Sequence, residues 1–215
     1  MHLVNVPARL RQLGIIPVVS LERVEAAIPL ADALLAGGLP CAEITFRTAA
    51  AEQSIRAMSQ AFPEILVGAG TVLNEDQIER AVAAGAKFIV SPGFSPMIVN
   101  YCQERNIPVF PGVCTPSDIQ IALETGLTML KFFPADAFGG LKTLKALSAP
   151  FPNVEFIPTG GISAANLAEY LNFPKVLACG GSWMVKSELI HEGKFAEINR
   201  LTAEAVAIKR QARPE

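Results

Sequence analysis

Histidine and charged residues are scarce in this sequence. The chain of 215 residues has only two histidines, His2 and His191, and both lie near its ends. A metal centre built on several histidines is therefore not expected, and we predict no metal. Charged residues make up 18% of the chain and the net charge is −2, so the composition gives no electrostatic reason to expect a nucleic-acid partner.

Long apolar runs are also absent. Hydrophobic residues make up 51% of the chain, yet no window approaches the roughly 18 consecutive apolar residues that a membrane span needs. The first 14 residues, with Arg9 and Arg11, predict a short amphipathic helix and not an export signal. The four cysteines match no metal or redox spacing. We expect no membrane partner, a cytoplasmic location and reduced thiols.

Short apolar runs alternate with segments of helical periodicity along the chain. Strands are predicted at Ile15–Val19, Ala42–Phe46, Ile65–Ala69, Phe88–Val90, Pro108–Phe110, Met129–Phe133, Val154–Ile157 and Val176–Ala178. Helices are predicted at Glu22–Ala36, Ala49–Ala61, Glu75–Ala84, Pro96–Arg105, Pro116–Glu124, Leu141–Leu147 and Ala164–Leu171, with terminal helix over Ser187–Ala212. This alternation is typical of parallel βαβ units.

Eight such units favour a single-domain α/β fold over residues 1–215, a (β/α)8 TIM barrel with additional terminal helices. The main alternative is an open doubly wound sheet. The barrel is favoured because the units extend from one end of the chain almost to the other. Helix ends are predicted at N-caps Asn74, Thr115 and Ser163 and at the glycines Gly37, Gly85 and Gly126.

Lys131 is the strongest candidate for chemistry. It lies inside the apolar strand Met129-Leu130-Lys131-Phe132-Phe133. Burial disfavours the charged form of lysine, and a neutral amine can attack a ketone to form an iminium. The alternative is a structural lysine whose stem is buried while its amine reaches solvent.

The strand that contains Glu43 is the second candidate. Strand alternation puts Glu43, Thr45 and Arg47 on one face, and Ile44 and Phe46 on the other. If the polar face points into the barrel, Glu43 could transfer protons and Arg47 could bind a carboxylate. The alternative is a buried Glu–Arg ion pair without a catalytic role.

Two glycine-rich turns follow the predicted seventh and eighth strands. They are Pro158-Thr159-Gly160-Gly161-Ile162-Ser163 and Cys179-Gly180-Gly181-Ser182-Trp183. Barrels often bind a phosphate group at this place through backbone N–H groups. The alternative is a pair of plain tight turns. Thr71, after the third strand, could bind a carboxylate oxygen or cap the next helix.

Five ordered stretches make the sequence resemble a known family. They are Ala42-Glu43-Ile44-Thr45-Phe46-Arg47-Thr48, Val67-Gly68-Ala69-Gly70-Thr71-Val72-Leu73, Lys131-Phe132-Phe133-Pro134-Ala135, Pro158-Thr159-Gly160-Gly161-Ile162 and Gly180-Gly181-Ser182-Trp183. The sequence is similar to the 2-keto-3-deoxy-6-phosphogluconate (KDPG) aldolases, also described as 4-hydroxy-2-oxoglutarate (KHG) aldolases. The resemblance covers nearly the whole chain.

The resemblance implies a class I aldolase that cleaves KDPG to pyruvate and glyceraldehyde 3-phosphate, and KHG to pyruvate and glyoxylate. Lys131 would be the Schiff-base lysine, Glu43 the acid/base, and Phe133 would pack beside the lysine. Arg47 and Thr71 would bind the carboxylate. The phosphate pocket would consist of Thr159, Gly160, Gly161, Gly181 and Ser182. The resemblance also implies a homotrimer and no metal or organic cofactor.

Three alternatives stay open at this point. Family members that favour the galactonate epimer tend to have arginine at the end of the first strand, where this chain has Ser20. This favours the gluconate epimer weakly and does not decide between them. A sugar-phosphate isomerase would share the phosphate turns but would need no imine. A phosphate-binding protein without catalytic activity could have kept the barrel and lost Lys131 or Glu43, whereas this chain has both.

Overall fold

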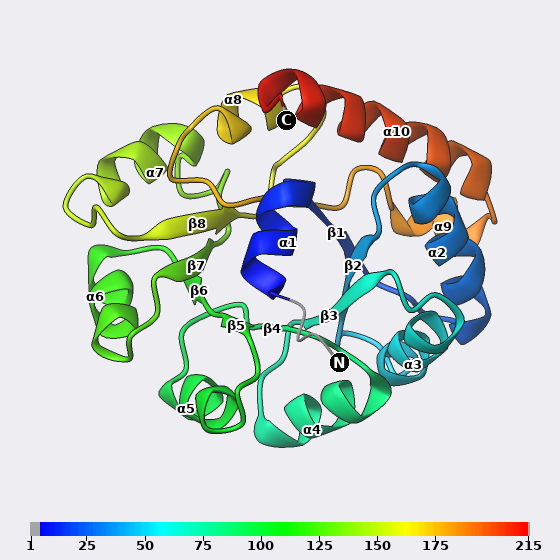
Figure 1. The fold of residues 1–215 in the computed structure, drawn as a ribbon, viewed down its shortest axis with the longest axis horizontal. Coiled ribbons are helices and arrows are strands. Elements are labelled where there is room, and N and C mark those ends of the chain that lie inside the picture. The colour runs from blue at the N-terminus through cyan, green and yellow to red at the C-terminus, as the bar shows by residue number, and fades with distance from the viewer. Residues whose placement is uncertain (1–4, 215) are drawn as a thin grey trace.

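The computed structural model describes residues 5–214 and forms a ring of parallel strands surrounded by helices (Figure 1). The strands are β1 (Ile15–Val19), β2 (Cys41–Thr45), β3 (Leu66–Gly70), β4 (Ile89–Val90), β5 (Val109–Phe110), β6 (Gly112–Val113), β7 (Met129–Phe132), β8 (Glu155–Pro158) and β9 (Cys179–Gly181). Parallel ladders join neighbouring strands over most of the ring.

The regular hydrogen-bond ladders are interrupted at two places in the ring, which divide it into two sheets. One sheet has the order β5-β4-β3-β2-β1-β9 and the other β6-β7-β8. Pro111 separates β5 from β6 because proline has no N–H to donate to a ladder. Two parallel bridges, Phe156 to Val176 and Thr159 to Gly180, join β8 to β9. Counting β5 and β6 as one, the described chain has eight barrel strands, and the predicted (β/α)8 fold is confirmed.

The helices alternate with the strands as expected. They are α1 (Val6–Leu13), the 3-10 turn η1 (Val24–Ala26), α2 (Ala27–Ala36), α3 (Ala51–Ala61), α4 (Glu75–Ala84), α5 (Pro96–Glu104), α6 (Pro116–Glu124), α7 (Gly140–Ser148), α8 (Leu167–Leu171), α9 (Ser187–His191) and α10 (Phe195–Ala212). The predicted terminal helical segment Ser187–Ala212 is confirmed, as two helices. It divides into α9 and α10 near Gly193, whose φ of 67° is left-handed. The last predicted strand is also displaced, from Val176–Ala178 to β9.

Most of the predicted helix ends are confirmed. Asn74 caps α4, Thr115 forms a capping box with α6, and Gly85 ends α4 in the left-handed conformation. Gly37 is not a left-handed cap. Its φ is −75°, and Gly38 takes φ 83° instead. A Cβ on Gly37 would lie 2.7 Å from the Cβ of Thr202, so this glycine lets α10 approach α2 closely.

Ser163 does not cap α8 with its side chain either. The assigned N-cap of α8 is Asn166, which makes no capping side-chain hydrogen bond to the helix. Instead the N–H of Ser163 donates to Oδ1 of Asn166 over 2.9 Å, and the carbonyl of Ser163 accepts from the N–H of Leu167. The predicted helix Ala164–Leu171 therefore begins three residues late, at Leu167.

Apolar side chains fill the half of the barrel at the N-terminal ends of the strands. Phe88 and Phe110 pack edge to face, with ring centroids 6.0 Å apart, and α1 adds Val6 and Leu10 to the same cluster. In Figure 1, α1 lies across the mouth of the ring that faces the viewer. Gly68 makes room for this packing, since a Cβ there would lie 2.2 Å from the ring of Phe88. The N-terminal end of the barrel is thus plugged.

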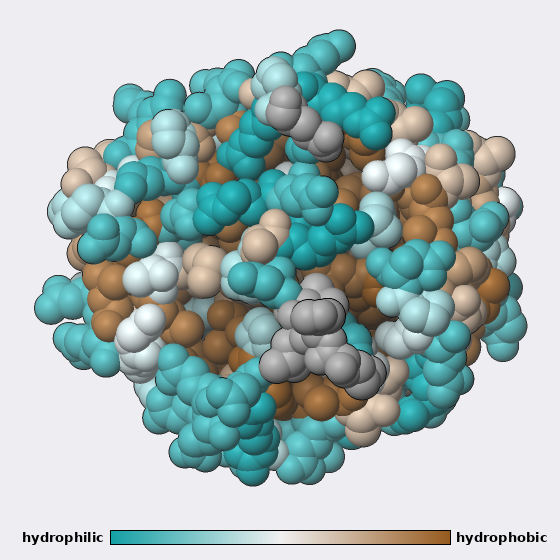
Figure 2. Space-filling model, viewed as in Figure 1, coloured by the Kyte–Doolittle hydropathy of each residue, from teal (hydrophilic) through white to brown (hydrophobic). Residues whose placement is uncertain are grey.

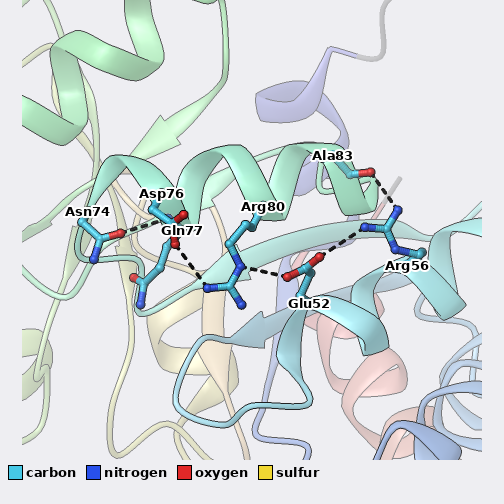
Figure 3. Close-up of polar contacts among 7 residues, drawn as sticks. All are labelled: Glu52, Arg56, Asn74, Asp76, Gln77, Arg80 and Ala83. Carbon is cyan, nitrogen blue, oxygen red and sulfur yellow. Dashed lines mark hydrogen bonds and ion pairs between the residues drawn. The ribbon is translucent and has the colours of Figure 1, made fainter.

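A second apolar layer lies between the ring and its helices, and polar contacts join neighbouring helices on the outside. Figure 3 shows that Glu52 of α3 pairs with Arg56 of the same helix and with Arg80 of α4, over 3.3 and 2.8 Å. Asp76 adds a further pair to Arg80 over 3.2 Å.

Hydrophilic residues cover much of the face in Figure 2, with hydrophobic residues visible between them. None of the helices in residues 5–214 has the length and apolar character to cross a membrane.

We predict that Leu10→Ala destabilises the barrel by about 2–5 kcal/mol, because Leu10 is fully buried and its loss leaves a cavity under the ring. Urea unfolding followed by circular dichroism measures this change. Gln12→Ala on the exposed side of α1 is the matched control and should shift stability by less than about 0.5 kcal/mol. Equal stabilities of the two variants would contradict the plug.

Candidate active site

Lys131 and Glu43 meet across the interior of the barrel. Lys131 is on β7 and Glu43 is on β2, four strands away in the ring and therefore on the opposite wall. Nζ of Lys131 lies 3.5 Å from Oε1 of Glu43. The two residues are 5% and 2% exposed. The predicted inward-facing position of Glu43 is confirmed, and Lys131 faces it from the opposite wall.

Strand alternation explains why the pair lies at this depth. Cys41, two residues before Glu43 on β2, belongs to the apolar plug. Burial raises the pKa of its thiol well above the ordinary value, and the nearby charge of Glu43 raises it further. Ile44, on the other face, packs in the outer layer as predicted. The ion pair therefore lies directly above the apolar plug.

Gly70 makes the space that Glu43 occupies. It is the last residue of β3, and a Cβ there would lie 2.1 Å from Oε1 of Glu43. Its backbone is not in the left-handed region, so the need for glycine is steric and not conformational. The small residues noted on this strand therefore shape the site from the neighbouring wall.

Arg47 and Thr71 meet just beyond the carboxyl ends of β2 and β3. Nε of Arg47 donates to Oγ1 of Thr71 over 3.2 Å. Thr71 has a φ of 56°, which is uncommon for a β-branched residue and fixes its direction after β3. The side chain that caps α4 belongs to Asn74, so the alternative capping role of Thr71 is wrong. Guanidinium and hydroxyl together offer several donors to a carboxylate.

The two glycine-rich turns lie side by side at the ends of β8 and β9. The bridge between Thr159 and Gly180 joins them. Gly160 and Gly161 have left-handed φ values of 95° and 80°, which a residue with a Cβ rarely adopts. Gly181 lies against the indole of Trp183, where a Cβ would be 1.9 Å from a ring carbon. Trp183 thus packs against the turn at Gly181, in keeping with a packing role.

A cavity of about 480 Å³ connects Arg47 with the two glycine-rich turns. Its lining includes every residue that we predicted for the phosphate pocket, together with Arg47 and Phe133: Thr159, Gly160, Gly161, Gly181 and Ser182. Nζ of Lys131 lies 5.2 Å from the ring centroid of Phe133, so the lysine is close beneath the cavity. The structure therefore brings all the predicted site residues together. Their individual roles stay predictions.

Sequence reasoning missed several residues of the cavity wall. Val18 and Val19 contribute from β1, and Lys186 and Glu188 contribute from the segment after β9. No motif distinguishes them, because they line the cavity only through the closure of the ring. A smaller cavity of about 280 Å³ adjoins it and includes Arg23 and His191 in its lining. Within residues 5–214, no three His, Cys, Asp or Glu side chains gather as a metal site would require.

Comparison with known proteins gives a consistent result. The family model described as KDPG and KHG aldolase matches residues 6–201. The chain belongs to the KDPG and KHG aldolase family. A 2-dehydro-3-deoxy-phosphogluconate aldolase of Treponema pallidum is 48% identical over 93% of this chain and 95% of its own. The KHG/KDPG aldolase of Escherichia coli is 44% identical over 89% and 90%.

Solved structures of this family have the same fold. The KDPG aldolase of Legionella pneumophila, with pyruvate captured as a covalent carbinolamine, has a TM-score of 0.89 at 41% identity and covers 93% of this chain and 97% of its own. The Zymomonas mobilis enzyme with 3-phosphoglycerate has a TM-score of 0.89 at 38% identity, covering 98% and 99%. The predicted family is confirmed.

Gly70→Ala tests whether the position of Glu43 matters in this aldolase. The added Cβ displaces the carboxylate, and we expect the aldol cleavage rate to fall about 100-fold or more. Gly93→Ala is the matched control, because no atom lies within 4 Å of its Cβ position and its φ is not left-handed. Cleavage rates and circular dichroism of both variants measure this. An unimpaired G70A enzyme would mean that Glu43 tolerates displacement.

Proposed function

We propose that this chain is a class I aldolase that cleaves KDPG to pyruvate and glyceraldehyde 3-phosphate, with Lys131 as the Schiff-base lysine. The buried Lys131–Glu43 pair, 3.5 Å apart beneath the cavity, is the observation that carries the proposal. The pyruvate carbinolamine in the Legionella enzyme supports it, because a carbinolamine precedes an imine. KHG, which would give pyruvate and glyoxylate, is proposed as a second substrate.

The reaction starts with Lys131 and the keto carbon. The Lys131 ammonium gives up a proton to the adjacent Glu43 carboxylate, and the neutral amine attacks C2, forming a carbinolamine. Glu43 then returns that proton to the carbinolamine hydroxyl, which leaves as water, and the resulting iminium draws electrons from the neighbouring bonds. Burial of the pair excludes bulk water from this step.

Glu43 then moves protons around C3 and C4. It accepts the proton of the C4 hydroxyl, directly or through one water, as the C3–C4 bond breaks and its electrons move into the iminium. Glyceraldehyde 3-phosphate leaves with a new aldehyde at C4. The remaining enamine takes a proton back at C3, and water hydrolyses the imine to pyruvate and free Lys131.

The groups above the ion pair orient the two ends of the substrate. Arg47 and Thr71 are proposed to bind the pyruvate-side carboxylate, and the glycine-rich turns are proposed to bind the phosphate. The 3-phosphoglycerate in the Zymomonas enzyme supports a phosphate site in this family. Binding at both ends fixes C2 against Lys131, so we expect a substrate without phosphate to react less well.

Gluconate stereochemistry is the proposed preference. Two KDPG aldolase structures are 38% and 41% identical to this chain, whereas the structure described as native KDPGal is 27% identical at a TM-score of 0.83. Ser20 at the end of β1 agrees with this preference. The galactonate epimer is the alternative, and kcat/KM for both epimers distinguishes them. The homotrimer and the cytoplasmic location stay predictions.

Borohydride trapping tests the imine. We predict that pyruvate and sodium borohydride leave a reduced pyruvyl adduct on Lys131, located by peptide mass spectrometry. Lys131→Ala should form no adduct and should lose cleavage, while the other lysines act as internal controls. Active, folded protein without an adduct would exclude the class I mechanism and favour a sugar-phosphate isomerase on the same barrel.

Glu43→Gln separates proton transfer from imine formation. The amide keeps the shape of the side chain but cannot accept a proton, so we expect kcat to fall by about 10²- to 10⁴-fold. Some trapped adduct should still form, because Lys131 is retained. Single-turnover cleavage and trapping of the same sample measure the two steps. Normal turnover would remove the acid/base role from Glu43.

A further inference from the structure

Lys186 lies at the edge of the cavity, beside the glycine-rich turns. It follows the turn in which the N–H of Val185 donates to the carbonyl of Ser182 over 3.1 Å. Met184 and Val185 are 0% and 2% exposed and anchor this segment to the barrel. Lys186 itself is exposed and lines the same cavity as Ser182. Lys186 is therefore anchored beside the proposed phosphate site by its buried neighbours.

The charges around the cavity are uneven. Among the described residues of its lining, Arg47 and Lys186 carry positive charge and Glu188 carries negative charge. Arg47 donates a hydrogen bond to Thr71, beyond the carboxyl ends of β2 and β3. In the ring, β1 separates β2, which Arg47 follows, from β9, which ends five residues before Lys186, so the two cations reach the cavity from different strands. Each cation therefore serves a different end of the cavity.

Among the described residues, Lys186 differs from nearby surface cations in having no ion-pair partner. Within residues 5–214, its ammonium makes no ion pair or side-chain hydrogen bond. Lys194, eight residues later, pairs with Glu192 over 2.6 Å, and Arg200 pairs with Glu197 over 2.7 Å. An unpaired ammonium at a cavity edge can engage an anionic ligand without first breaking an internal ion pair.

We propose that Lys186 is a specificity-determining residue that binds the phosphate group of the substrate and selects phosphorylated over unphosphorylated 2-keto acids. This inference rests on the proposed function. A phosphate monoester carries about −1.5 to −2 charges at neutral pH, and the glycine-rich turns offer it only neutral N–H and hydroxyl donors. Lys186 supplies the full positive charge at that end, while Arg47 is committed to the carboxylate end.

The test compares kcat/KM for KDPG and for KHG, which has no phosphate, in Lys186→Met. We expect the ratio of the two values to fall about three- to fivefold, the effect of one exposed ion pair. The change should lie in KM for KDPG and should shrink as salt is raised, because salt screens an exposed charge. Lys186→Arg should keep most of the wild-type ratio.

Lys87→Met is the matched control. Lys87 is also exposed, but it precedes β4 at the plugged end of the barrel, so its loss makes the same charge change far from the cavity. The ratio of kcat/KM for KDPG to kcat/KM for KHG in Lys87→Met should equal that of the wild type. Pyruvate trapping on Lys131 in each variant checks that the imine site is intact.

The outcomes separate the two proposals. An unchanged ratio in K186M, or an equal loss for both substrates, would overturn the role of Lys186 and leave the aldolase assignment standing. A wild-type enzyme that traps no pyruvate and cleaves neither substrate would overturn the proposed function, and the inference would fall with it. A selective, salt-dependent loss on KDPG supports both.

Discussion

The buried ion pair between Lys131 and Glu43 is the interaction on which the rest of the site depends. Taking two charges out of water costs several kcal/mol, and replacing such a pair by apolar residues is often neutral or stabilising. Lys131 and Glu43 are 5% and 2% exposed, so their pair is not explained by a gain in stability. Its position is explained better by chemistry, because an amine and a carboxylate 3.5 Å apart can exchange a proton.

The surrounding structure makes that pair possible. Below it, α1, Phe88 and Phe110 fill the barrel and keep water from the lower half. Beside it, Gly70 leaves the space that the Glu43 carboxylate needs. Above it, flexible glycine backbone and Arg47 form an open, polar cavity. The barrel is thus divided into an apolar plug that supplies stability and a polar mouth that is free to bind a ligand.

Several elements could be predicted from local sequence, and the failures have identifiable causes. The caps at Asn74 and Thr115 depend on side chains three residues from their partners, so the sequence shows them directly. Gly37 has the same local signature, yet it serves a contact with Thr202 on α10, far along the chain. Likewise, Gly193 divides the predicted terminal segment Ser187–Ala212 into α9 and α10, a break that helical periodicity alone does not locate.

By itself, the sequence determined the strand–helix alternation, the polar face of the strand at Glu43 and the unusual lysine at position 131, because each is encoded by the period of neighbouring residues. The tertiary structure alone decided that Glu43 and Lys131, 88 positions apart, point at each other, and that Lys186 lines the same cavity as Gly160. Local periodicity fixes which face a side chain is on. The distance between two faces depends on how the ring of strands closes.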